Sequence, residues 1–134
     1  MNKEKTLLHV EREGAAMIEY KLAEAESRFA ELIWDNEPLA SGELVKMAAA
    51  QLEWKSTTSY TVLRRLCDRG LFQNVDSVVT SCVSREDFYK HKSHQFVEES
   101  FGGSLPKFLA AFMGKKKLSE EQIAEIQKMI EDFE

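Results

Sequence analysis

Apolar residues recur at three- and four-residue steps in the first half of the chain, as they do along the buried face of an α-helix. Three segments carry this pattern, residues 23–36, 41–52 and 56–68. Glutamates cluster in the first turn of the first segment, where the helix dipole favours negative charge. The pattern predicts three short helices, with Ser41 and Ser56 as N-caps and with Pro38 and Gly70 as end signals.

The pattern changes after Gly70, where two short runs rich in β-forming residues follow each other. Residues 71–74 and 78–83 are expected to pair as a hairpin across the link 75–77. Three helices followed by a small β-hairpin form the element order of a winged helix-turn-helix domain. The order of the elements, more than any single residue, supports this interpretation.

Helical spacing returns after Ser84. Ser84, Ser104 and Ser119 are each placed to cap a new helix, and Gly102 and Gly103 are expected to separate the first two of these helices. The sequence therefore predicts a mainly α chain with a small β-hairpin, in which a winged helix-turn-helix domain precedes a C-terminal helical dimerisation arm. The expected divisions are a flexible N-terminal extension over 1–19, the winged-helix domain over 20–84 and the helical arm over 85–134.

The arm carries more apolar side chains than a short group of helices buries by itself. A second copy of the chain would cover them, and symmetric dimers are the commonest oligomers, so we expect a homodimer. The alternative is that the arm folds back onto the first domain. The residues expected at the dimer interface are Phe101, Leu105, Phe108, Leu109, Phe112, Leu118, Ile123, Ile126, Ile130 and Phe133.

Composition limits the class of protein. The 134 residues are 43% hydrophobic and 31% charged, and no apolar run reaches the roughly 18 residues of a membrane span. The sequence does not begin with an apolar signal core, and its two cysteines, Cys67 and Cys82, fit thiols that stay reduced in the cytoplasm. We expect a cytoplasmic protein without direct membrane insertion.

Motifs for catalysis are lacking. The sequence has no Gly-rich phosphate loop, no Gly-x-Ser-x-Gly elbow and no His-Glu-x-x-His. His91 and His94 lie three residues apart, but no cysteine or third histidine accompanies them, so they are expected to be exposed polar residues and not metal ligands. No enzymatic activity, cofactor or metal is therefore expected.

Charge is distributed unevenly along the chain, whose formal net charge is −5. Between Lys55 and Arg69, four basic side chains stand against the single carboxylate of Asp68. Hydroxyl and basic side chains of the third predicted helix share the face opposite its apolar side, where they are suited to contact a DNA duplex. The candidate DNA-binding residues are Lys55, Ser56, Thr57, Thr58, Tyr60, Thr61, Arg64 and Arg65.

Two alternatives remain open. Arg64 or Arg65 could form a surface ion pair instead of contacting a phosphate, since such pairs are common. The domain could also be a winged-helix protein-protein interaction module without DNA binding, which the acidic total charge would suit.

Four groups of residues carry a family resemblance: Leu22-Ala-Glu-Ala-Glu-Ser with Leu32-Ile-Trp, Ser59-Tyr-Thr-Val-Leu-Arg-Arg-Leu, Gly70-Leu71, and Phe101-Gly-Gly-Ser-Leu. In their order and spacing they resemble the BlaI/MecI/CopY family of bacterial transcriptional repressors, the penicillinase repressors. The likeness spans about residues 20–133. It implies a homodimer whose winged helix binds a palindromic double-stranded DNA operator upstream of resistance or stress genes, and whose C-terminal helices interlock the two protomers.

The resemblance places the family's helix-three contacts on Thr57, Thr58, Tyr60 and Thr61, with Arg65 at a frequently basic position. Family members often carry Lys at the first of these positions and a basic residue at the third, so base preference could differ here. The predicted wing also departs from the family, because residues 74–79 hold one carboxylate and no cation. We therefore expect few phosphate contacts and a shallow salt dependence of DNA binding.

The resemblance also implies an inducing event, which is cleavage by a membrane-bound sensor metalloprotease that responds to β-lactams. The bond that matches is Ala111–Phe112, although Phe112 could simply be a core residue. Cleavage would weaken the dimer and lower operator affinity, because one of two tethered contacts is lost. No Cys-x-Cys pair follows Cys82, so the copper-dependent control of CopY-type members is not implied.

Overall fold

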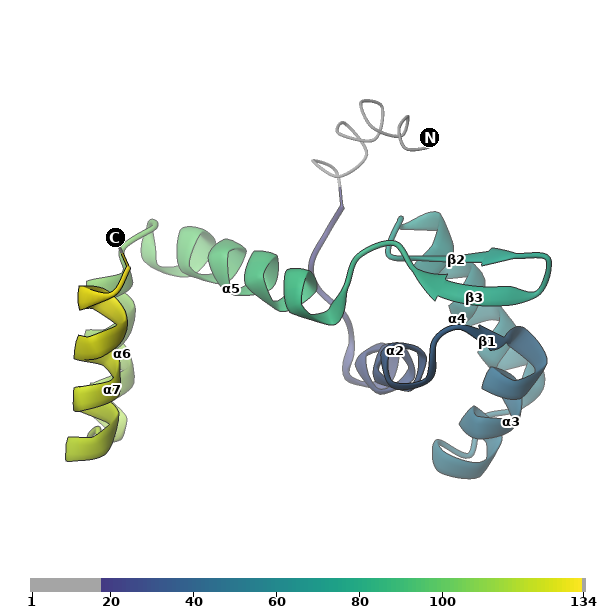
Figure 1. Ribbon diagram of the computed structural model, residues 1–134, viewed down its shortest axis with the longest axis horizontal. Helices are drawn as coiled ribbons and strands as arrows, with labels where there is room; N and C mark the ends of the chain where they lie inside the picture. The colour runs from purple at the N-terminus through teal and green to yellow at the C-terminus, as the bar shows by residue number, and fades with distance from the viewer. Residues whose placement is uncertain (1–17, 134) are drawn as a thin grey trace. The chain divides into compact units, whose positions relative to one another are not determined.

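The computed structural model describes residues 18–133, and the predicted extension over 1–19 lies outside them except for its last two positions (Figure 1). Helices predominate, together with one small antiparallel sheet, so the predicted class of a winged helix domain followed by C-terminal helices is confirmed. The elements are α2 (Glu24–Asn36), β1 (Leu39–Ala40), α3 (Ser41–Gln51), α4 (Ser56–Asp68), β2 (Phe72–Val75), β3 (Val78–Ser81), α5 (Arg85–Phe101), α6 (Leu105–Lys115) and α7 (Glu120–Glu131).

Two compact units divide the chain within α5, one ending at Lys92 and the other beginning at Ser93. In the first unit, helices α2, α3 and α4 enclose one apolar core with the sheet. Each helix buries the face that its spacing predicts. The fully buried core side chains include Phe29, Ile33, Leu44, Leu66, Leu71, Phe72, Val79 and Phe88.

The sheet has the strand order β1-β3-β2, and both pairings are antiparallel. Sequence patterns did not reveal β1, because two residues are too few to show an alternating period. The hairpin itself is tighter than predicted. Val75 pairs with Val78, so only Asp76 and Ser77 form the turn, and both adopt positive φ angles of 52° and 65°, as a two-residue hairpin turn requires.

The helix starts are partly as predicted. Ser84, Ser104 and Ser119 each accept a hydrogen bond from a backbone N–H three residues on, at 3.1 Å, as N-caps do. Ser41 and Ser56 are instead the first residues of their helices, and the residues before them make no side-chain cap. The Ser41 N–H donates to the Ser77 carbonyl at 2.8 Å, so the hairpin turn satisfies this donor.

The first turns of α5 pack on α2. Phe88 is fully buried, with its ring centroid 5.8 Å from that of Tyr20 and 5.5 Å from that of Trp34. The Trp34 indole donates to the Val83 carbonyl at 3.0 Å. Arg85 forms ion pairs with the carboxylates of Glu31 and Asp35.

The second unit contrasts with the first, because no residue of 93–133 is fully buried. Four phenylalanines, Phe96, Phe101, Phe108 and Phe112, form a chain of ring contacts with centroids 5.5 to 6.2 Å apart.

None of the helices that the structure describes is both long and apolar enough to cross a membrane.

Candidate nucleic-acid interface

Helix α4 presents one face to the core and the other to solvent. Ser59, Val62, Leu63 and Leu66 are buried, so the helix is anchored along one side. All the candidate DNA-binding residues are exposed on or next to its free side, as is Asp68; the candidates are Lys55, Ser56, Thr57, Thr58, Tyr60, Thr61, Arg64 and Arg65. The fold therefore brings these side chains together on a rigid element, as a recognition helix requires.

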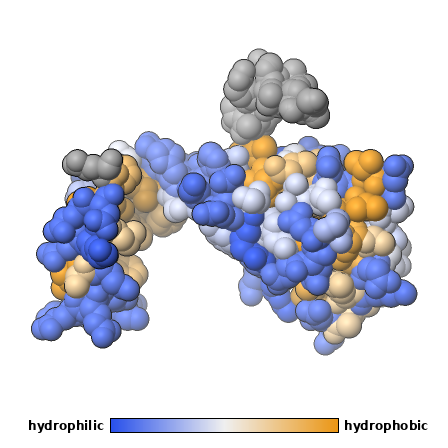
Figure 2. Space-filling view, in the orientation of Figure 1, coloured by the Kyte–Doolittle hydropathy of each residue, from blue (hydrophilic) through white to orange (hydrophobic). Residues whose placement is uncertain are grey.

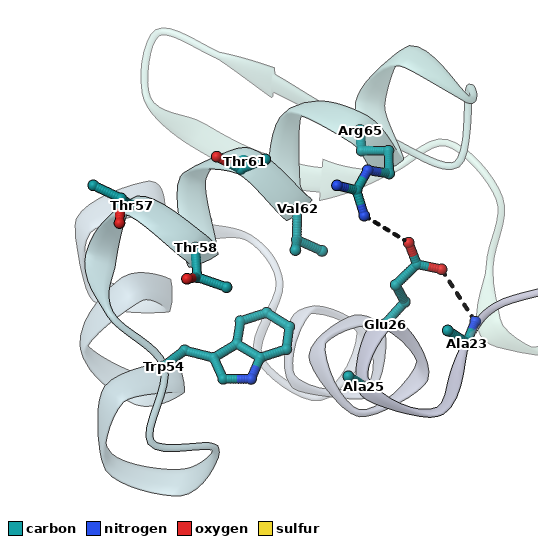
Figure 3. A pocket seen from close by; sticks show the side chains of 9 residues that line it. All are labelled: Ala23, Ala25, Glu26, Trp54, Thr57, Thr58, Thr61, Val62 and Arg65. Atoms are coloured by element: carbon teal, nitrogen blue, oxygen red, sulfur yellow. Dashed lines mark hydrogen bonds and ion pairs between the residues drawn. The ribbon is translucent and has the colours of Figure 1, made fainter.

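Three threonines line one side of a groove between α4 and the first turn of α2 (Figure 3). The groove has a volume of about 540 Å³, and the indole of Trp54 lines it. This indole stacks on Phe29 with 5.1 Å between the ring centroids. The other lining residues are Ala23, Ala25, Glu26, Thr57, Thr58, Thr61, Val62 and Arg65.

Arg65 forms an ion pair across this groove. Its Nη1 lies 3.2 Å from Oε2 of Glu26 (Figure 3). The other carboxylate oxygen lies 3.6 Å from Nη1 of Arg69. Of the two roles left open for Arg65, the surface ion pair is thus present in the structure. Within residues 18–133 no ion pair involves the exposed Arg64.

A smaller hollow of about 300 Å³ lies between α4 and β2. Tyr60, Arg64 and Asn74 line it with a hydroxyl, a guanidinium and an amide, together with Leu63 and Cys67. All three polar groups can donate hydrogen bonds to a phosphate oxygen. Sequence patterns missed Asn74, because only the packing of the hairpin places it beside α4.

The hairpin carries apolar residues toward solvent. Val75 and Val78 are 55% and 44% exposed, and they flank the turn of Asp76 and Ser77. Figure 2 shows apolar surface over this hairpin. Since Asp76 is the one charged residue of 72–81, the wing offers no cation to a phosphate backbone.

Cys67 and Cys82 are free thiols. Burial raises the pKa of the Cys67 thiol, and the negative charges of Cys82 and Asp68 raise it further. A thiol with a raised pKa is a poor nucleophile and a poor metal ligand at neutral pH. Among residues 18–133, no three His, Cys, Asp or Glu side chains gather as a metal site would need.

The residues predicted at the dimer interface lie in the second unit and keep much of their surface in solvent. Leu105, Ile130 and Phe133 are 54%, 65% and 88% exposed, and Phe112 is 44% exposed. Phe101, Phe108, Leu109, Leu118 and Ile126 are half-buried, and Ile123 is 43% exposed. The Ala111–Phe112 bond lies within α6, where both residues are exposed.

A winged-helix domain with a hydroxyl-rich, basic helix face is the architecture of a transcription regulator. The chain belongs to the penicillinase repressor family, whose model matches residues 22–132. This membership confirms the resemblance to BlaI/MecI repressors, and it identifies the chain as a regulator and not an enzyme.

Two relatives illustrate the match. The penicillinase repressor of Bacillus licheniformis is 25% identical over 116 residues, which cover 84% of this chain and 91% of that protein. The methicillin resistance regulatory protein MecI of Staphylococcus aureus strain Mu50 is 23% identical over 115 residues, which cover 83% of this chain and 94% of that protein. The similarity therefore extends over both compact units.

Proposed function

We propose that the protein is a homodimeric transcriptional repressor that binds a palindromic operator in double-stranded DNA through α4. The observation that supports this most strongly is the exposed face of α4, where three threonines, a tyrosine and two arginines lie side by side. Its relatives are named as a penicillinase repressor and a methicillin resistance regulator, which agrees with a role at resistance genes.

On an operator, Thr57, Thr58 and Thr61 would read bases, because threonine hydroxyls bond base edges and threonine methyls contact the thymine methyl. Tyr60 and Arg64, together with Asn74 of the hairpin, would hold one phosphate in the hollow that they line. Lys55 and Ser56 stand at the start of α4, where backbone N–H groups and the helix dipole favour another phosphate. The contacts are few, and so we expect a shallow salt dependence.

Dimerisation would use the second unit. Residues 93–133 leave large apolar side chains exposed and bury none of their side chains fully, and a second copy of the chain would cover this apolar surface. Two linked copies would then present α4 to two half-sites, and the second contact would form at high effective concentration.

Relief of repression would follow cleavage at Ala111–Phe112 by a membrane-bound sensor metalloprotease, after a β-lactam or another stress signal. Cleavage would remove Phe112 and all of α7, and with them Leu118, Ile123, Ile126, Ile130 and Phe133. Immunoblotting of cells before and after β-lactam treatment tests this step. A fragment ending near residue 111 supports it, and a chain that stays intact while the target genes are induced rejects it.

The DNA-binding proposal is tested with the triple variant Thr61→Ala, Arg64→Gln and Arg65→Gln. We expect salt-sensitive binding to a palindromic duplex to be lost while the circular dichroism spectrum is unchanged, since all three side chains are exposed. A triple variant that binds as tightly as the wild type contradicts the proposal. If the wild type binds no duplex but both forms retain one protein partner, the alternative of an interaction module is correct.

A further inference from the structure

We propose that Glu26 sets the strength of operator binding by competing with a DNA phosphate for Arg65. The inference rests on the proposed function and assigns a role to a residue of α2 that lies outside α4. Glu26 would act as an internal substitute for phosphate in the free protein. The repressor would therefore bind its operator less tightly than its arginines alone would allow.

The geometry of the Glu26 carboxylate supports this competition. It lines the same groove as the threonines of α4, and it faces Arg65 at 3.2 Å (Figure 3). A carboxylate and a phosphate can each offer two acceptor oxygens to a guanidinium group. The contact with Glu26 is made by Nη1 of Arg65, so a phosphate that binds this nitrogen from the groove must displace Glu26.

Of the two partners, Glu26 is the more firmly held. Its Oε1 accepts a hydrogen bond from the backbone N–H of Ala23 at 3.1 Å and lies 3.6 Å from Arg69. The Glu26 side chain is only 14% exposed, whereas that of Arg65 is 54% exposed. Arg69 is held in turn, because it donates to the carbonyls of Glu19 and Lys21.

The difference between the two side chains determines which of them moves when DNA binds. Arg65 is the partner that is free to turn toward a phosphate, while the carboxylate stays at the groove wall. The fixed negative charge then repels the bound phosphate, since like charges at short range oppose binding in a partly desolvated site. Glu26 therefore weakens the complex twice, by holding Arg65 in the free protein and by facing the phosphate afterwards.

The substitution Glu26→Gln isolates the charge. Glutamine at the third helical position still accepts the bond from the Ala23 N–H, so the start of α2 is preserved. The matched control is Glu24→Gln, which removes the same charge from the same helical turn at an exposed position. At physiological salt the screening length is about 8 Å, so the control reports only the weak general effect of net charge.

Fluorescence anisotropy on an operator selected by the wild type is the measurement. We expect Glu26→Gln to tighten binding by at least about fivefold while the slope of log affinity against log salt stays nearly the same, because Arg65 makes the same phosphate contact in both proteins. Glu24→Gln should change affinity by less than about twofold with the slope unchanged. Equal effects of the two variants, or weaker binding by Glu26→Gln, would overturn the inference.

A double variant tests whether the effect passes through Arg65. In an Arg65→Gln background, we expect Glu26→Gln to lose most of its gain, because the contested guanidinium is absent. If Glu26→Gln tightens DNA binding as much in the Arg65→Gln background as in the wild type, the proposed competition for Arg65 is contradicted. Failure of the wild type to bind any duplex would instead reject the proposed function, so the two failures are distinguishable.

Discussion

Arg64 and Arg65 are neighbours on one exposed face, yet their surroundings differ. Arg65 is paired with Glu26, whereas Arg64 lines the hollow with Tyr60 and Asn74. We predict that Arg64→Gln weakens operator binding more than Arg65→Gln does, and that it makes the salt slope shallower by about 0.9 for each protomer. Anisotropy titrations over a range of salt concentrations compare the two, and a larger loss from Arg65→Gln would contradict the prediction.

Ser59 is the polar residue buried in the core face of α4. Its exposed fraction is 0%, and its hydroxyl has no hydrogen-bond partner among the described residues. We predict that Ser59→Ala raises the free energy of unfolding by roughly 1 kcal/mol, because an unsatisfied buried hydroxyl is removed and alanine favours the helix. Urea denaturation measures this.

Ser84→Ala is the control for that prediction, since the same chemical change there removes an N-cap. It should cost roughly 1 kcal/mol. A Ser59→Ala protein that is destabilised as much as Ser84→Ala would show that the Ser59 hydroxyl is satisfied.

At the residue scale, the sequence predicts burial and exposure well where both depend on the periodicity of a single helix. The inward and outward faces of α4 follow from periodicity, which places Ser59 on the buried side and Thr61 on the exposed side, as observed. The ion pair between Glu26 and Arg65 was beyond such reasoning, because it joins residues 39 positions apart. The tertiary fold brings the two side chains together across the groove between α2 and α4.

Among the elements, the start of α5 is anchored in the core of the first unit. Phe88 is enclosed by Tyr20 and Trp34 and has no exposed surface. We predict that Phe88→Ala destabilises the first unit by about 3 to 5 kcal/mol, as large-to-small changes of core phenylalanines do. Tryptophan fluorescence during urea denaturation reports this, because both tryptophans lie in the first unit.

The control is Phe96→Ala, which makes the same change on the same helix at a ring that is 50% exposed. It belongs to the second unit and should leave the transition of the first unit unmoved. Equal shifts from both variants would mean that Phe88 is not a core residue of the first unit.

Long periodic elements were predictable, and short or paired ones were not. Helices α2, α3 and α4 and the caps of the later helices follow from local sequence, because side chains within a few residues determine them. Strand β1 exists only because β3 lies beside it, and the turn at Asp76 and Ser77 is set by the register of the hairpin. Strand β1 depends on a partner distant in sequence. The turn depends on positive φ angles at two residues other than glycine.

At the scale of the whole molecule, the exposed apolar side chains of residues 93–133 form the proposed dimer interface. We predict that Ile130→Lys raises the dimer dissociation constant at least tenfold and lowers operator affinity, because a charge is placed on the apolar side of α7. Sedimentation velocity at several concentrations measures the change. Glu125→Lys, on the same helix at an exposed polar position, should leave association intact. An Ile130→Lys protein that stays dimeric at every concentration contradicts the assignment of this surface.

Selection of bound duplexes from a random pool tests the central claim most directly, because it examines DNA binding, specificity and symmetry together. We predict enrichment of a palindrome whose half-sites are centred about one helical turn apart, or a multiple of it, as two α4 helices in successive major grooves require. Enrichment should disappear in the triple variant of Thr61, Arg64 and Arg65. A pool that stays random at low salt, or an enriched site without twofold symmetry, would contradict the account.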